Sequence, residues 1–183
     1  MKIESNPDSV KEEDLIQLYL ECFSTGTSEQ FIDSVELKKY LKSFYLHGAI
    51  LSIQDQEKLV GALLALPLSY DKLFPENLRK NYDSNKTWYI AELMITEDHR
   101  AKGLGKELLN EFFKNAELSE IKDVIIRVWD ENYAALNLYR KIGFEEIASI
   151  FQTKTKADLS GTFQMKKIYM HKKVTSYELQ VNR

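Results

Sequence analysis

Residues 100–106 read Arg-Ala-Lys-Gly-Leu-Gly-Lys and lie between two apolar segments of different periodicity. The pattern predicts a buried strand over 88–95, then this turn, then a helix over 104–116. Gly103 and Gly105 carry no Cβ, so the backbone can approach a ligand closely there. The first-turn N–H groups of such a helix have no intrahelical partners and carry partial positive charge, which suits a pyrophosphate. The three basic side chains of the stretch add to that charge.

A Gly-x-Gly turn by itself is weak evidence for a phosphate site. The dinucleotide-binding fingerprint needs a third glycine where Leu108 stands, and a P-loop needs Ser or Thr where Glu107 follows Gly105-Lys106. Taken alone, the stretch fits a tight strand-to-helix turn in a basic surface loop equally well.

A second constellation begins with Asn132, about thirty residues further on. Asn132, Ala135 and Tyr139 are spaced three and seven apart, which places them on one face of a helix. Ala135 is small, so a ligand can lie close to that face, and its two neighbours offer polar groups. The alternative reading is that Asn132 caps the helix and Tyr139 belongs to its core edge.

The two constellations together strongly resemble the GNAT superfamily of acetyl-CoA-dependent N-acyltransferases. The matching pattern is Arg100-x-x-Gly103-x-Gly105 followed by Asn132-x-x-Ala135-x-x-x-Tyr139-x-x-x-Gly143-Phe144. The resemblance covers about residues 8–174, but only 88–144 is specific. It implies one N-acetyltransferase domain over 1–183, with acetyl-CoA as co-substrate.

The resemblance also implies where CoA binds. In this superfamily the fourth strand and the next one splay apart, and the pantetheine arm lies between them. The matching strand positions here are Leu93, Met94 and Ile95, and the amide of Met94 is expected to polarise the thioester carbonyl.

The pyrophosphate and the departing thiolate are assigned to the other two segments. The pyrophosphate is expected on Arg100, Ala101, Lys102, Gly103, Leu104, Gly105 and Lys106. On the second segment, Asn132 and Ala135 are expected to bind the cofactor, and Tyr139 to contact it and protonate the thiolate. Ala101 stands where the family often has glycine, and alanine costs little there as long as the backbone is not left-handed.

The expected general base is Glu92. An alkylammonium acceptor must lose a proton before its nitrogen can attack, and Glu92 is the only charged residue between Trp88 and Ile95. An acid in an apolar strand is desolvated, which raises its pKa. The alternatives are a strand-end Glu paired with a nearby Lys or Arg, or a water chain in place of the base.

The hydrophobic pattern predicts a mixed α/β (α+β) fold, with a central and mostly antiparallel sheet of about six or seven strands and helices on both faces. The expected order is a helix after Ser9-x-x-Glu12, a helix after Asp33-x-x-Glu36 that stops at His47-Gly48, strands over 49–53, 58–66 and 88–95, a helix over 104–116, a strand over 124–129, a helix over 134–142, and strands over 144–151 and 165–172. The segments 70–86 and 151–161 are expected as long polar loops, and both could wall the acceptor site.

Composition restricts the class of protein. The net charge of −3 does not favour nucleic acid, and the single cysteine excludes an internal disulfide. With no apolar leader at the N-terminus and no long apolar run, a cytoplasmic protein without membrane contact is expected. Cys22 lies on an apolar helical stripe and reads as structural, and the three histidines have no metal-ligand spacing, with His99 expected as a solvated loop residue.

The expected partner is a small-molecule or peptide amine, attacked directly in a ternary complex, and an exposed final strand would offer a homodimer edge. Two other functions stay open. A non-catalytic CoA-binding sensor of the same fold would keep the phosphate site without an acid or base. A nucleotide- or phosphate-binding protein of another fold would use only Gly103 and Gly105.

Overall fold

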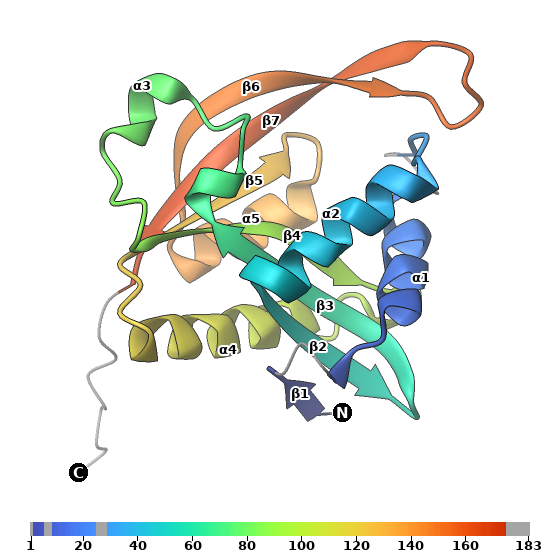
Figure 1. Ribbon diagram of the computed structural model, residues 1–183, viewed down its shortest axis with the longest axis horizontal. Helices are drawn as coiled ribbons and strands as arrows, with labels where there is room; N and C mark the ends of the chain where they lie inside the picture. The colour runs from blue at the N-terminus through green and yellow to red at the C-terminus, as the bar shows by residue number, and fades with distance from the viewer. Residues whose placement is uncertain (1, 6–8, 25–28, 175–183) are drawn as a thin grey trace.

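The computed structural model describes residues 2–5, 9–24 and 29–174, apart from the side chains of 117 and 118. Seven strands form one sheet in the order β1-β2-β3-β4-β5-β7-β6 (Figure 1). Only β4 and β5 pair in parallel, and the other neighbours are antiparallel. The strands are β1 (Lys2–Glu4), β2 (Ala49–Asp55), β3 (Lys58–Pro67), β4 (Thr87–Ile95), β5 (Asp123–Trp129), β6 (Glu145–Thr155) and β7 (Thr162–Lys173). The mixed, mostly antiparallel sheet expected from the sequence is confirmed.

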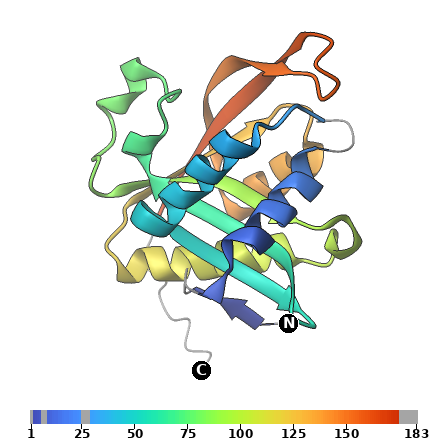
Figure 2. The same cartoon turned by 45° about the vertical axis from the view of Figure 1, so that its right-hand side comes forward.

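Helices cover both faces of this sheet, as expected. They are α1 (Glu12–Phe23), α2 (Ser34–His47), α3 (Glu76–Arg79), α4 (Leu104–Leu118) and α5 (Tyr133–Ile142), with two 3-10 turns, η3 (Leu68–Tyr70) and η4 (Glu97–His99). Figures 1 and 2 show α1 and α2 across one face and α4 on the other.

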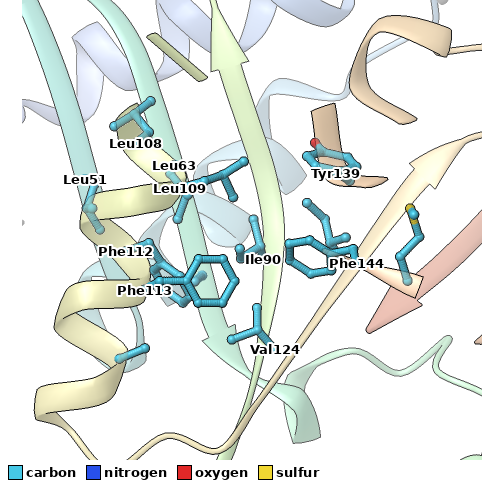
Figure 3. Close-up of a cluster of buried hydrophobic side chains, with 14 of the residues drawn as sticks. Leu51, Leu63, Ile90, Leu108, Leu109, Phe112, Phe113, Val124, Tyr139 and Phe144 are labelled. Carbon is cyan, nitrogen blue, oxygen red and sulfur yellow. The ribbon is translucent and has the colours of Figure 1, made fainter. Parts of the chain in front are cut away.

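The larger core lies between the sheet and the pair α4 and α5. Leu108, Leu109, Phe112 and Phe113 of α4 are all buried, because their spacing places them on one helical face. They pack on strand residues such as Ile90 (Figure 3). A second core joins α1 and α2 to the opposite face of β2, β3 and β4. The two cores therefore pack on opposite faces of the central strands of the sheet.

Four details differ from the sequence expectation. The first helix begins at Glu12 with Lys11 as its N-cap, so the N-cap is not Ser9 as expected. The short strand β1 was not expected, since three residues carry too little periodicity to be recognised. Strand β6 continues to Thr155 and β7 begins at Thr162, so residues 156–161 form a short connection where a longer polar loop was expected. The final strand β7 lies inside the sheet, and β6 forms the edge.

The start of α2 offers a test of the local structure. The Asp33 carboxylate accepts hydrogen bonds from the amides of Val35 and Glu36, both at 2.9 Å. We expect Asp33→Ala to lower the free energy of unfolding by about 1 kcal/mol, because two first-turn amides lose their acceptor. Asp33→Asn keeps an acceptor oxygen and serves as the control. Equal denaturation midpoints for the two variants in urea would contradict this account.

Candidate active site

The parallel pair β4–β5 separates halfway along its length. Its register runs from Thr87↔Asp123 to Ile90↔Ile126, and the second half of β4 has no partner on β5. On its other side, β4 carries one extra residue: Leu64 of β3 lies opposite Glu92, and the next residue of β3 lies opposite Ile90. Such a bulge bends the strand that carries it. The expected splayed pair is therefore present, and a bulge marks the point where it opens.

A cavity of about 350 Å³ lies at this separation. The volume is within the range of small-molecule sites. Its walls come from α1, α2, β4, β5, α5, β6 and β7, including Tyr40, Glu92, Leu93, Arg127, Asn132, Tyr139, Lys154 and Lys167. The residues expected to be acid and base thus face the same space.

Glu92 reaches this cavity from the α1–α2 face of β4. The Tyr40 hydroxyl donates to its Oε1 at 2.8 Å. Burial raises the pKa of Glu92, while the Tyr40 hydrogen bond and the positive charges of Lys167, Arg127 and Lys154 act in the opposite direction. No cationic nitrogen lies within 4 Å of its carboxylate in the described parts of the chain, so the strand-end ion pair considered as an alternative is absent there.

Tyr139 reaches the cavity from the other face, on α5. It is only 5% exposed and packs against Phe144 at 5.9 Å between ring centroids (Figure 3). Burial, and secondarily the negative charge of Glu92, raise the pKa of Tyr139 well above its ordinary value. The hydroxyl therefore keeps its proton at neutral pH and can act only as a donor in acid–base chemistry.

The backbone amides facing the strand gap are not those expected. The amide of Thr96 donates to Val60 of β3 at 2.9 Å. Because alternate residues of an antiparallel ladder face the same neighbour, Met94 also directs its amide to β3. Leu93 and Ile95 direct theirs toward the gap. The expectation that the Met94 amide polarises a thioester is therefore wrong, and the two adjacent residues take that position.

The basic side chains of residues 100–106 are exposed at the start of α4, while Leu104 of the same stretch is buried. Gly103 has φ +86, which favours glycine, and a Cβ there would meet open space. Ala101 has φ +59, so its backbone is left-handed, and the condition under which alanine was expected to cost little is not met. The amides of Lys106 and Glu107 already donate to the Gly103 carbonyl, at 2.9 and 3.1 Å, so the amides of Leu104 and Gly105 are the first-turn groups that fit an anion.

Gly105 brings the two sequence constellations together. A Cβ on Gly105 would lie 3.4 Å from Leu138 of α5 and 3.7 Å from Leu93 of β4. The loop, the separated strand and the second helix thus meet around one glycine. Asn132 is the N-cap of α5, its Oδ1 accepting from the Ala135 amide at 3.1 Å. The capping role considered from the sequence is confirmed, while cofactor contacts of Asn132 and Ala135 stay predictions.

Sequence reasoning missed the basic side chains of the cavity. Arg127 of β5 donates to Asp71 at 3.1 Å and to the Tyr169 hydroxyl at 2.8 Å. Lys154 of β6 and Lys167 of β7 also line the cavity. Arg127 could have been found as Glu92 was, because it is the only charged residue in the middle of an apolar strand. Lys154 lies beyond the end of the strand expected over 144–151, and Lys167 stands next to a second lysine, Lys166, so no sequence pattern singles either one out.

The two loops expected to wall the site differ in role. Gln152 and Lys154 of the second segment line the cavity, but no residue of 70–86 does. That first segment instead places the buried Asp71 against Arg127 and packs Phe74 on Tyr169. This segment therefore contacts Arg127, a residue of the cavity wall, without lining the cavity itself.

Other residues noted in the sequence lie outside the cavity. Burial chiefly raises the pKa of Cys22, whose thiol contacts the Ile95 carbonyl at 3.7 Å, which fits its structural reading. The expectation that His99 is a solvated loop residue is wrong, because its ring nitrogens form hydrogen bonds with Thr96 at 2.9 Å and with Asp55 at 3.3 Å.

Among the described residues no cluster of three His, Cys, Asp or Glu could hold a metal ion. The helices they form include none that is long and apolar enough to cross a membrane.

Comparison with known proteins gives the class. The chain matches the acetyltransferase (GNAT) family over residues 12–144, and it belongs to that family. It is 32% identical over 74 residues to the spermine/spermidine N(1)-acetyltransferase of Bacillus subtilis, covering 40% of this chain and 47% of that protein. It is 24% identical over 116 residues to N-acetyltransferase family 8 member 3 of Rattus norvegicus, covering 63% and 46%. The matches thus span about half the length of these curated relatives.

Solved structures agree on the fold. The ribosomal-protein-alanine N-acetyltransferase of Brucella melitensis superposes with a TM-score of 0.69 at 18% identity, over 94% of this chain and 99% of that one. The Salmonella typhimurium protein yncA, solved with its cofactor acetyl-CoA, gives 0.66 at 17% identity, over 97% and 95%. The mixed seven-stranded sheet is thus that of GNAT acetyltransferases.

The left-handed Ala101 yields a second prediction. We expect Ala101→Gly to raise the free energy of unfolding by about 0.5–1 kcal/mol, since relief of strain exceeds the added freedom of the unfolded chain. Ala134→Gly on the exposed face of α5 is the control and should lower stability by about 1 kcal/mol. Denaturation in urea measures both, and a destabilised Ala101→Gly would contradict the strain.

Proposed function

We propose that this protein transfers an acetyl group from acetyl-CoA to a primary amine of a small molecule or peptide, by direct attack in a ternary complex. One observation carries the proposal: Glu92 and Tyr139 enter one cavity from opposite faces of the sheet, where β4 and β5 separate. A protonated donor and a carboxylate of raised pKa on either side of a gap are what amine acylation requires.

The chain's residues fit acetyl-CoA as co-substrate. The amides of Leu104 and Gly105 and the exposed side chains of Arg100, Lys102 and Lys106 offer donors and positive charge for a pyrophosphate. Gly105 lies next to β4, since a Cβ on it would be 3.7 Å from Leu93. The gap beside β4 presents the amides of Leu93 and Ile95, which can hydrogen-bond an extended arm or a carbonyl oxygen.

Two side chains carry out the proton transfers of the proposed reaction. The bound co-substrate supplies an acetyl group activated as a thioester. Glu92 takes a proton from the acceptor ammonium, so that the nitrogen lone pair can form the new C–N bond. Tyr139 holds its proton and donates it to the sulfur as the C–S bond breaks. Cys22 is not used, so no acetyl group passes through the enzyme itself.

Removal of the donor tests the role of Tyr139. We expect Tyr139→Phe to lower kcat by about 10²-fold, since one positioned proton donor is lost, while the Kd for CoA changes little. Tyr133→Phe, on the exposed start of the same helix, is the control. A Tyr139→Phe enzyme with unchanged kcat near neutral pH would remove Tyr139 from the acid role.

The hydrogen bond from Tyr40 gives a pH prediction for Glu92. Burial raises the pKa of Glu92 and the Tyr40 hydroxyl lowers it, so Tyr40→Phe should raise it further. Because the base must be ionised, activity rises with pH through that pKa, and the rising limb of kcat/KM should move to higher pH in Tyr40→Phe. Glu92→Gln should abolish the limb and most of the activity. An unmoved limb would assign the base role to a water chain.

A thiol-release assay with acetyl-CoA and a broad amine panel tests the proposal as a whole. Release of CoA with at least one amine is expected. Thermal stabilisation by acetyl-CoA without turnover would instead indicate the non-catalytic CoA-binding module. Competition by ATP or NAD, with no effect of CoA, would indicate a nucleotide-binding protein and overturn both.

A further inference from the structure

The cavity carries more positive than negative charge. Its lining includes Arg127, Lys154 and Lys167 but only one carboxylate, that of Glu92. Asp71 lies 3.1 Å from Arg127 and compensates that guanidinium. The two lysines have no carboxylate oxygen within 4 Å anywhere in residues 2–5, 9–24 and 29–174. Beside the one carboxylate of Glu92, the cavity wall therefore carries two ammonium groups that have no ion-pair partner among the described residues.

The strand register places both lysines on the cavity face of the β6–β7 hairpin. Gln152 pairs with Met165, and Lys154 and Lys167 each follow two residues later on their own strands. Because side chains alternate between the faces of a sheet, all four point the same way, and all four line the cavity. Lys166 lies on the opposite, exposed face.

The hairpin is held over the cavity by its far end. The amide of Phe31, just before α2, donates to the Thr155 carbonyl at the end of β6 at 2.9 Å. Figure 1 shows the hairpin crossing above the sheet toward α2. The lysines are thus part of a built wall of a small cavity.

Holding two ammonium groups in this wall is unfavourable without an anion. Burial, then the nearby charge of Lys154, lower the pKa of Lys167 to about 8, although Glu92 and Asp130 act in the opposite direction. Burial and Arg127 lower the pKa of Lys154, against Glu92. An anionic group between them would favour the charged forms of both lysines.

That anion does not come from the proposed pyrophosphate site. The loop 100–106 belongs to the start of α4, and none of its residues lines this cavity. The unmatched positive charge therefore faces the space left for the acceptor.

We propose that the acceptor is a small primary amine that also carries an anionic group, a carboxylate or a phosphate, bound by Lys154 and Lys167 while its nitrogen faces Glu92. This inference rests on the proposed acetyl transfer and narrows its acceptor. A polyamine, which the Bacillus subtilis relative acetylates by its name, would bring further positive charge to these lysines.

Matched acceptor pairs test the proposal in the intact protein. CoA release is measured with α-amino acids against their α-amides, with ω-aminoalkyl phosphates against ω-amino alcohols, and with spermidine. We expect kcat/KM to be at least about tenfold higher for the anionic member of one pair, the size of a charge-assisted hydrogen bond. The pair that shows the difference identifies the anion as carboxylate or phosphate.

Substitution of the two hairpin lysines by neutral residues provides the second part of the test. Lys154→Gln/Lys167→Gln should raise KM for the anionic acceptor by about tenfold or more and leave that of the neutral partner within about twofold. Lys166→Gln, on the other face of β7, is the matched control and should change neither. CoA binding and the melting temperature confirm that the double variant is folded. If it is not, the single Lys167→Gln variant is used with the same acceptor pairs.

The outcomes separate this inference from the proposed function. Equal rates within both pairs, or preference for spermidine, would overturn the anionic acceptor while acetyl transfer stands. If no amine is acetylated, acetyl transfer fails, and calorimetry of the same acceptor pairs with the CoA-bound protein decides the inference. Tighter binding of the anionic members, lost in the double variant, supports it, and equal binding overturns it.

Discussion

The separation of β4 from β5 is the constraint on which the rest of this protein depends. The two strands pair only as far as Ile90 and Ile126, and at that point β4 carries the extra residue Ala91, a bulge that bends the strand. An unpaired strand edge in a protein interior is costly unless its amides and carbonyls find partners. Here the open edge lies beside a cavity, so its backbone groups remain available to a ligand. The gap in the sheet thereby leaves backbone donors and acceptors to which a ligand can hydrogen-bond.

The same gap explains why two groups from opposite faces can act together. Glu92 lies on the face covered by α1 and α2, and Tyr139 belongs to the core under α4 and α5. In a continuous sheet the backbone layer would separate them. Where the strands part, both face one cavity, and the charge of Glu92 contributes to the raised pKa of Tyr139. Desolvation raises the pKa of both groups, since burial disfavours the charged form of each.

The charge of the cavity wall is opposite in sign to the net charge of the chain. The chain as a whole carries −3, yet the described cavity wall has three cations and one carboxylate. Asp71, delivered by the segment between β3 and β4, compensates Arg127 and leaves the hairpin lysines as the excess. Net charge therefore says little about the acceptor. A fold does not by itself determine a substrate, so the acceptor has to be inferred from the residues of the cavity wall.

Much of the architecture could be predicted from the sequence, because helices and strands depend largely on local patterns of residues. Apolar periodicity predicted the main helices and the central strands, Asp33 and Gly143 marked helix ends, and the glycines of 100–106 with Tyr139 indicated the family. Only the tertiary structure decided the register of β4, which assigns the gap-facing amides to Leu93 and Ile95, and the face of β6–β7 that carries Lys154 and Lys167. Register depends on pairing between residues far apart in the chain, and a bulge of one residue reverses which groups face a cavity. No local pattern contains that information, so the residues proposed to carry out the reaction could be predicted from the sequence, while the lysines proposed to bind the acceptor could not.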